Sequence, residues 1–255
     1  MSEPLAGRTV LVTRPAHQAQ GLAERIRAAS GDAFVFPALA IEPVPHADLA
    51  ASLARLPTVD VLVFASPNAA RFGMAAIRAA GGLPVAAQVF AVGPGTARAL
   101  ADTGVDGVIV PHGQDSEALL ALPALQDVAG RRVLIVRGVG GRPLLADTLT
   151  ARGAQVAFLE CYRRACPHAD PAPLLARWQA GGIDAVTVAS AETLYNLAHM
   201  LGEPGAPLLV HTPLFAPHAK IAEAARRFGV VRAITTEGGD AGLADGLVNW
   251  FRDNT

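Results

Sequence analysis

The sequence predicts an α/β fold built from two similar, doubly wound parallel-sheet halves. Short β-rich runs alternate with longer Ala- and Leu-rich segments of helical period, and this alternation indicates βαβ units. The second observation is an internal repeat. Val10–Arg14 (VLVTR) matches Val133–Arg137 (VLIVR) 123 positions later, and Asp60–Ser66 matches Asp184–Ser190 at an interval of 124. The common order and interval of these matches predict an internal duplication.

The strands and the first helix follow from local pattern. The first expected strand is Thr9–Thr13 (TVLVT), and Arg14-Pro15 ends it. Leu22, Ile26 and Ala29 then recur at the spacing of one helix face. The later strands are expected at Ala33–Phe36, Val59–Ala65, Gln88–Val92, Gly107–Val110, Arg132–Arg137, Gln155–Glu160, Asp184–Ala189, Leu208–His211 and Val231–Thr235.

Several helix starts come directly after expected strands. Ser66-Pro67 fits an N-cap followed by proline at the first helical position. Gly93–Thr96 leads into a helix that stops at Gly104, and Asp115–Glu117 opens another. In open α/β sheets, ligands bind at the carboxyl ends of the strands, so these junctions are where we expect a site.

The composition excludes several classes of function. The 255 residues include 21 Lys and Arg against 22 Asp and Glu, a net charge of −1, which lacks the basic excess of a general nucleic-acid binder. Cys161 and Cys166 are too few for a disulfide framework or a four-ligand zinc site. No apolar run approaches the ~18 residues of a membrane span, and the acidic start Met1–Pro4 is unlike a signal peptide. We expect a cytoplasmic chain that binds neither nucleic acid nor membranes.

Candidate site residues follow the expected strands. Arg14 and Arg137 take equivalent places after the first strand of each repeat, and a charged residue in such a loop is more often functional than incidental. Helix starts with Gly, Ser or Thr offer unpaired N–H groups that attract phosphate or carboxylate, although each such residue could also be a simple N-cap. The candidates are Arg14, Ser66, Asn68, Thr96, Arg137, Gly138 and Ser190.

Known motifs exclude other chemistry. Gly138-x-Gly140-Gly141 is an incomplete dinucleotide fingerprint, and the chain has neither a phosphate loop nor a hydrolase nucleophile elbow. The seven histidines lack metal-ligand spacing, so no metal is expected. Tyr162 follows a strand, where it could donate a proton to a ligand or pack structurally. The residues alone leave both roles for Tyr162 open.

Together these stretches resemble the uroporphyrinogen-III synthase family over essentially the whole chain. The order of the segments, with VRG-x-GGR and YRR among them, makes the resemblance specific. The matching segments are VLVTRP (Val10–Pro15), Pro37 with Ile41–Pro43, the DVLVFASPNA stretch (Asp60–Ala69), VGPGTARAL (Val92–Leu100), DSEALL (Asp115–Leu120), Arg132–Val156, ECYRR (Glu160–Arg164) and ASAET (Ala189–Thr193).

The resemblance implies two similar α/β domains joined by a two-stranded β-ladder, with the active site in the cleft between them. One domain would combine residues 1–38 with 168–255, and the other would span 39–167. The ladder segments would be Leu39–Val44 and Tyr162–Pro167. The chain is further expected to be a monomer.

The implied reaction cyclises hydroxymethylbilane, a linear tetrapyrrole with many carboxylates, to uroporphyrinogen III. Water is lost and ring D is inverted through a spiro intermediate, without metal or organic cofactor. Tyr162 matches a tyrosine thought to assist departure of the hydroxyl, and Ser66, Thr96 and Ser190 match polar positions that face the cleft. The second repeat departs at Pro217–Lys220, where Lys220 would bring a charge to the substrate-binding surface.

Two other classes of function are kept as alternatives. A two-domain protein that binds a polyanionic metabolite without catalysis would share the cleft and the repeat. A nucleotide-dependent enzyme is disfavoured because the phosphate-loop and dinucleotide patterns are missing.

Overall fold

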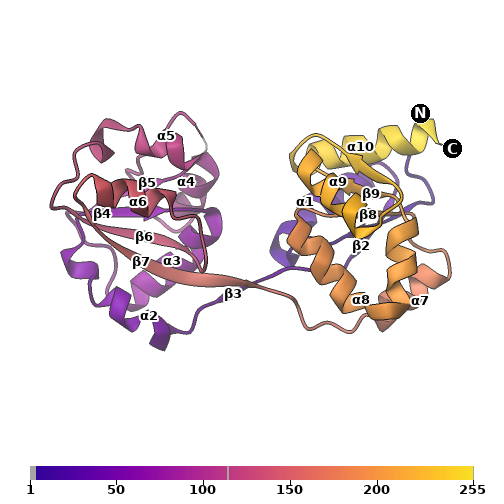
Figure 1. The fold of residues 1–255 in the computed structure, drawn as a ribbon, viewed down its shortest axis with the longest axis horizontal. Helices are drawn as coiled ribbons and strands as arrows, with labels where there is room; N and C mark the ends of the chain where they lie inside the picture. The colour runs from indigo at the N-terminus through magenta and orange to yellow at the C-terminus, as the bar shows by residue number, and fades with distance from the viewer. Residues whose placement is uncertain (1–3, 114, 255) are drawn as a thin grey trace. The chain divides into compact units, whose positions relative to one another are not determined.

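The computed structural model describes residues 4–113 and 115–254 (Figure 1). The chain splits into two compact units, one formed by Met1–Ala40 with Ala165–Thr255 and the other by Ile41–Arg164. Each unit contains one five-stranded sheet. The prediction of an α/β fold with parallel sheets is confirmed, because seven of the strand pairs in the two sheets are parallel.

The first unit has the strand order β10-β9-β8-β1-β2, with helices packed against both faces of the sheet. Leu11 and Val186 face a core shared with α7, α8 and α9, whereas Val10 and Val12 face a core shared with α1 and α10. This alternation follows from the opposite directions of successive strand side chains. The elements are β1 (Thr9–Val12), α1 (Ala16–Ala28), β2 (Asp32–Val35), α7 (Ala172–Gln179), β8 (Ala185–Thr187), α8 (Ala191–His211), β9 (Leu214–Ala216), α9 (Ala219–Phe228), β10 (Ala233–Thr235) and α10 (Gly239–Asp253).

The second unit has the strand order β3-β7-β6-β4-β5. Leu62 and Phe64 face the core under α2, α3 and α4, while Val61 and Val63 face the core under α5 and α6. The elements are β3 (Ala40–Pro43), α2 (His46–Leu53), η1 (Leu56–Thr58), β4 (Val61–Phe64), α3 (Pro67–Ala79), β5 (Gln88–Ala91), α4 (Pro94–Ala101), α5 (Ser116–Leu120), η2 (Pro123–Leu125), β6 (Arg132–Gly138), α6 (Leu144–Ala151) and β7 (Gln155–Ala165).

One expected strand was wrong. Leu208–His211 is the last turn of α8, and the strand of this region is β9, directly after Pro213. A short apolar run fits a buried helix as well as a strand. The helix accommodates Pro204 because Gly202 interrupts it with non-helical torsion angles. Pro204 therefore stands in a new first turn, where a missing N–H removes no helical hydrogen bond.

A second expected strand is reduced to a single bridge. Within Gly107–Val110, only Ile109 pairs, with Phe90 of β5. The helix starts at Ser66-Pro67 and Asp115 are confirmed: Ser66 Oγ accepts the Ala69 N–H, and Asp115 Oδ1 accepts the Ala118 N–H. Both caps place the first turn of a helix directly at the carboxyl edge of the second sheet.

Candidate active site

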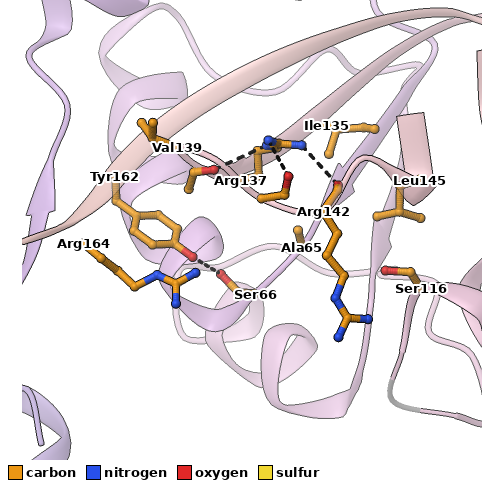
Figure 2. Close-up of a pocket in the computed structure, with 12 residues that line it drawn as sticks. Ala65, Ser66, Ser116, Ile135, Arg137, Val139, Arg142, Leu145, Tyr162 and Arg164 are labelled. Carbon is orange, nitrogen blue, oxygen red and sulfur yellow. Dashed lines mark hydrogen bonds between the residues drawn. The ribbon is translucent and has the colours of Figure 1, made fainter. Parts of the chain in front are cut away.

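A pocket of ≈ 190 Å³ lies at the carboxyl ends of β4 and β6 in the second unit (Figure 2). Its wall comes from the loops after these two strands, the start of α5, and the last part of β7. The lining residues are Ala65, Ser66, Ser116, Ile135, Arg137, Gly138, Val139, Gly141, Arg142, Leu145, Tyr162 and Arg164. This is the strand edge at which an open α/β sheet binds ligands.

Two hydroxyl groups meet in this pocket. Tyr162 Oη lies 3.1 Å from Ser66 Oγ, as Figure 2 shows. Ser66 is the N-cap of α3, and its Oγ accepts the Ala69 N–H at 3.0 Å. The Tyr162 ring stacks on Phe72, with 5.9 Å between the ring centroids. The phenol is thus held both at its ring and at its hydroxyl group.

Gly138 gives the Tyr162 ring the space that it occupies. The pairing of β6 with β7 shifts register between Arg137 and Gly138, so that Gly138 lies opposite Tyr162. A Cβ at Gly138 would stand 2.6 Å from Tyr162 Cζ and 3.0 Å from Tyr162 Oη. Both distances are shorter than ordinary van der Waals contact, so a side chain at this position would displace the Tyr162 ring.

Arg137 uses its guanidinium within the protein. Nε donates to the Gly138 carbonyl at 3.3 Å, Nη1 to the Arg142 carbonyl at 3.3 Å and Nη2 to the Gly141 carbonyl at 2.9 Å. Glu160 lies 3.3 Å from Nε, and only 12% of the arginine side chain is exposed. Arg137 therefore lines the pocket while its hydrogen bonds run to its own loop.

The exposed cations of the pocket are Arg142 and Arg164, neither of which was a sequence candidate. Figure 2 shows the Arg142 side chain extending near Ser116, and Arg164 beside Tyr162. None of the lining residues that the structure describes is acidic, so this wall favours anions. Arg164 could have been found from the sequence, because it follows Tyr162 by two positions and therefore points to the same face of a strand. Only the fold of its loop places Arg142.

The other candidates of the second unit lie outside this pocket. Asn68 is half-buried in the first turn of α3. Thr96 is buried, with 4% of its surface exposed, and it does not cap α4, because Gly93 takes the N-cap position. Thr96 instead donates its backbone N–H to the Gly93 carbonyl at 3.0 Å.

The candidates of the first unit lie at the carboxyl edge of its own sheet. Arg14 Nη1 pairs with Asp240 Oδ1 at 2.6 Å, and 19% of the arginine side chain is exposed. Ser190 caps α8, accepting the Thr193 N–H at 3.1 Å. Lys220 is exposed in the first turn of α9. Arg14 and Arg137, predicted to be equivalent, thus both have acidic partners inside the protein.

Three other features bear on the function of the described part of the chain: thiol reactivity, metal binding and membrane-spanning helices. Burial raises the pKa of Cys161 to about 12, which keeps this thiol protonated and unreactive. Residues 4–113 and 115–254 contain no group of three or more His, Cys, Asp or Glu side chains placed to hold a metal ion. Across the same residues, none of the helices has the length and apolar character needed to cross a membrane.

Comparison with known proteins decides the family. A family model described as "Uroporphyrinogen-III synthase HemD" matches residues 20–242. The chain belongs to the uroporphyrinogen-III synthase family. Among its relatives, uroporphyrinogen-III synthase of Salmonella typhimurium is 43% identical over 194 residues, 74% of this chain and 78% of that protein. The enzyme of Escherichia coli K12 is 37% identical over 225 residues, 87% of this chain and 92% of that protein.

Solved structures of uroporphyrinogen-III synthases support the same fold. A mutant uroporphyrinogen III synthase from Thermus thermophilus superposes with a TM-score of 0.59 at 23% identity, covering 96% of this chain and 97% of that one. The enzyme from Helicobacter pylori 26695 gives a TM-score of 0.56 at 13% identity, with 97% and 99% covered. At these identities the likeness shows the fold alone.

Proposed function

We propose that this member of the uroporphyrinogen-III synthase family converts hydroxymethylbilane to uroporphyrinogen III without a metal or organic cofactor. The observation that carries the proposal is the pocket itself. A phenol and a serine hydroxyl lie 3.1 Å apart in a wall whose charged side chains, among residues 4–113 and 115–254, are all arginines. This combination suits proton donation to a neutral leaving group on a substrate with many carboxylates.

Tyr162 is proposed as the catalytic acid and Ser66 as its hydrogen-bond partner. Because Ser66 Oγ already accepts the Ala69 N–H, its own proton is available to Tyr162 Oη. The phenol proton can then point toward the substrate hydroxyl. The serine hydroxyl and the N-terminus of α3 would stabilise the negative charge that develops on the phenol oxygen.

The proposed steps balance without a redox partner. The phenol proton passes to the terminal hydroxyl of the substrate, and the C–O bond breaks to release water and an azafulvenium cation. The ring D carbon that carries the bridge to ring C attacks the methylene carbon of the cation, and the new C–C bond gives a spiro intermediate. That intermediate fragments at the old bridge bond and recloses at the free carbon of ring D. The proton lost there restores the pyrrole and returns to the phenolate.

Arg142 and Arg164 are proposed to bind substrate carboxylates. Both are exposed and line the pocket beside the hydroxyl pair, and guanidinium groups match carboxylates with paired hydrogen bonds. Arg137 and Gly138 shape the same wall. Closure to the inverted isomer depends on how the chain is held, so positioning is the larger part of catalysis here.

We further infer that the two units arose by internal duplication and that β3 and β7 form the ladder that joins them. The strand orders support a common origin, since β2-β1-β8-β9 and β7-β6-β4-β5 repeat one pattern. The Val44 N–H donates to the Cys161 carbonyl at 3.1 Å, and both strands lie where the chain passes from one unit to the other.

The remaining expectations stay predictions. The domain limits 1–38 with 168–255 and 39–167, and an active site in a cleft between the units, are among them. Substrate contacts from Arg14, Asn68, Thr96, Ser190 and Lys220, a monomeric state and a cytoplasmic location are others.

The test is the product formed from hydroxymethylbilane, which closes spontaneously to the uninverted isomer I. Purified protein should shift the product to isomer III, measured by chromatography of the oxidised porphyrins. Tyr162→Phe should lower kcat strongly while affinity for uroporphyrin III is kept. Tyr195→Phe is the matched control, since it removes the only other tyrosine, which is 50% exposed in the first unit. Isomer I alone from the wild-type protein would leave the alternative of a non-catalytic polyanion-binding protein.

A further inference from the structure

We infer that Arg137 is a positioning residue for the loop at residues 138–142, and that it acts on the substrate through this loop rather than by direct contact. The inference rests on the proposed function, because it concerns the same pocket. Its basis is the set of partners around one guanidinium. Three loop carbonyls, those of Gly138, Gly141 and Arg142, accept hydrogen bonds from Arg137.

The sequence of the loop favours conformational freedom. Three of its five residues are glycine, which loses more conformational freedom on ordering than any other residue. Gly140 adopts a left-handed conformation with φ +73. The loop's main-chain anchor to β7 is the hydrogen bond from the Val139 N–H to the Tyr162 carbonyl at 2.9 Å. The arginine therefore supplies the fixed points that the loop sequence lacks.

The Arg137 guanidinium is also held by two side chains of β7, Phe158 and Glu160. Its guanidinium carbon lies 4.5 Å from the centroid of the Phe158 ring, and Glu160 lies 3.3 Å from Nε. A planar guanidinium has five donors in a rigid fork, whereas lysine is a point charge on a flexible stem. Three different nitrogens of the Arg137 guanidinium donate to the three carbonyls. A lysine at position 137 would keep the positive charge but could not hold the three carbonyls in the same geometry.

The loop links Arg137 to two parts of the proposed active site, the Tyr162 ring and the Arg142 side chain. At one end, Gly138 faces the Tyr162 ring, where a Cβ would stand only 2.6 Å from Cζ. At the other end, the carbonyl of Arg142 is bonded to Arg137, and the Arg142 side chain lines the pocket (Figure 2). Without the hydrogen bonds of the Arg137 guanidinium, the backbone of Arg142 would be less restrained, and Gly138 would pack less firmly against the Tyr162 ring.

The decisive experiment is a double-mutant cycle between Arg137→Gln and Arg142→Ala in the full chain. The readouts are kcat, KM, the fraction of isomer III, and affinity for uroporphyrin III measured by porphyrin fluorescence. If Arg137 acts through Arg142, each single change should weaken uroporphyrin III binding about tenfold, and adding Arg137→Gln to Arg142→Ala should change it by less than about twofold. Arg137→Lys should behave like Arg137→Gln and lower the fraction of isomer III.

The control is Arg132→Lys at the opposite end of β6, where Arg132 pairs with Asp60. It should leave all four readouts unchanged. A merely structural loss would reduce the amount of folded protein without changing KM or the isomer fraction. Additive effects in the cycle, or an Arg137→Lys variant with wild-type KM and isomer fraction, would overturn the inference. A wild-type protein that makes only isomer I would instead refute the proposed function.

Discussion

Gly138→Ala should disable the site by displacing one aromatic ring. The added methyl group would stand 2.6 and 2.7 Å from two carbons of the Tyr162 ring and 3.0 Å from its hydroxyl oxygen. Carbon atoms need about 3.5–4.0 Å, so the ring must move by roughly 1 Å. The contact with Ser66 Oγ is 3.1 Å long, already at the long end for two hydroxyl groups, so a shift of this size would disturb it.

We expect kcat to fall about 100-fold, a loss that a 1 Å misplacement of a reacting group can cause. Overpacking should also lower the free energy of unfolding by about 1–3 kcal/mol. The assay is initial-rate kinetics with hydroxymethylbilane, combined with thermal unfolding and the isomer III fraction. Gly95→Ala is the matched control, because its Cβ would meet only Pro67 at an ordinary 3.8 Å.

A second arm separates ring displacement from general damage. Once the hydroxyl is removed by Tyr162→Phe, the further change Gly138→Ala should have little effect on kcat, because the ring no longer carries the acid. Additive losses in the double variant would mean that Gly138 matters for another reason. A Gly138→Ala enzyme with wild-type kcat and isomer fraction would refute the reasoning from the contact distances.

Three further predictions concern single side chains. Ser66→Ala should lower kcat and reduce stability by about 1 kcal/mol through loss of the helix cap, whereas Ser66→Thr should retain the cap; an equal thermal midpoint for Ala and wild type would contradict the cap. Arg142→Gln and Arg164→Gln should each raise KM about tenfold, and added salt should shrink that difference because both side chains are exposed; a KM that is unchanged at low salt would remove them from carboxylate binding. Cys161 is buried, with a pKa raised to about 12, so a maleimide at pH 8 should modify only Cys166 in the native protein and both thiols in denaturant. If mass spectrometry finds that Cys161 in the native protein is labelled as fast as Cys166, its burial is not maintained.

Much of the fold could be predicted because strand and helix patterns are local. The buried run in β1 and the cap and proline at Ser66-Pro67 are features of neighbouring residues, and both formed as expected. Leu208–His211 failed because a four-residue apolar run does not choose between helix and strand. Its helical state depends on Gly202, six residues earlier, which lets the prolines of this segment follow a kink.

The site was only partly predictable, since its contacts are not local. Ser66 and Tyr162 were both candidates, but they are 96 positions apart, and only the neighbouring strands β4, β6 and β7 bring their hydroxyl groups within 3.1 Å. Arg164 shares the strand face of Tyr162, a relation that the spacing already contains. Arg142 lies in a glycine-rich loop whose path no local pattern specifies.

Arg14 and Arg137 show that a sequence repeat predicts where a residue lies in the fold but not which groups it contacts. Arg14 stands two residues after the end of β1, and Arg137 lies in the last part of β6, the strand that matches β1 in the other repeat. The connections that follow the two arginines differ. Between β1 and α1 lie only residues 13–15, too few to fold back over Arg14, whose guanidinium reaches Asp240 of α10. Between β6 and α6 lie residues 139–143, enough to pass over Arg137 and present their carbonyls to it. Loop length, rather than position in the repeat, thus decides which arginine organises a pocket wall. Under the proposed function, Arg142 at the end of the loop would meet the substrate carboxylates, and Arg137 would support the loop that carries it.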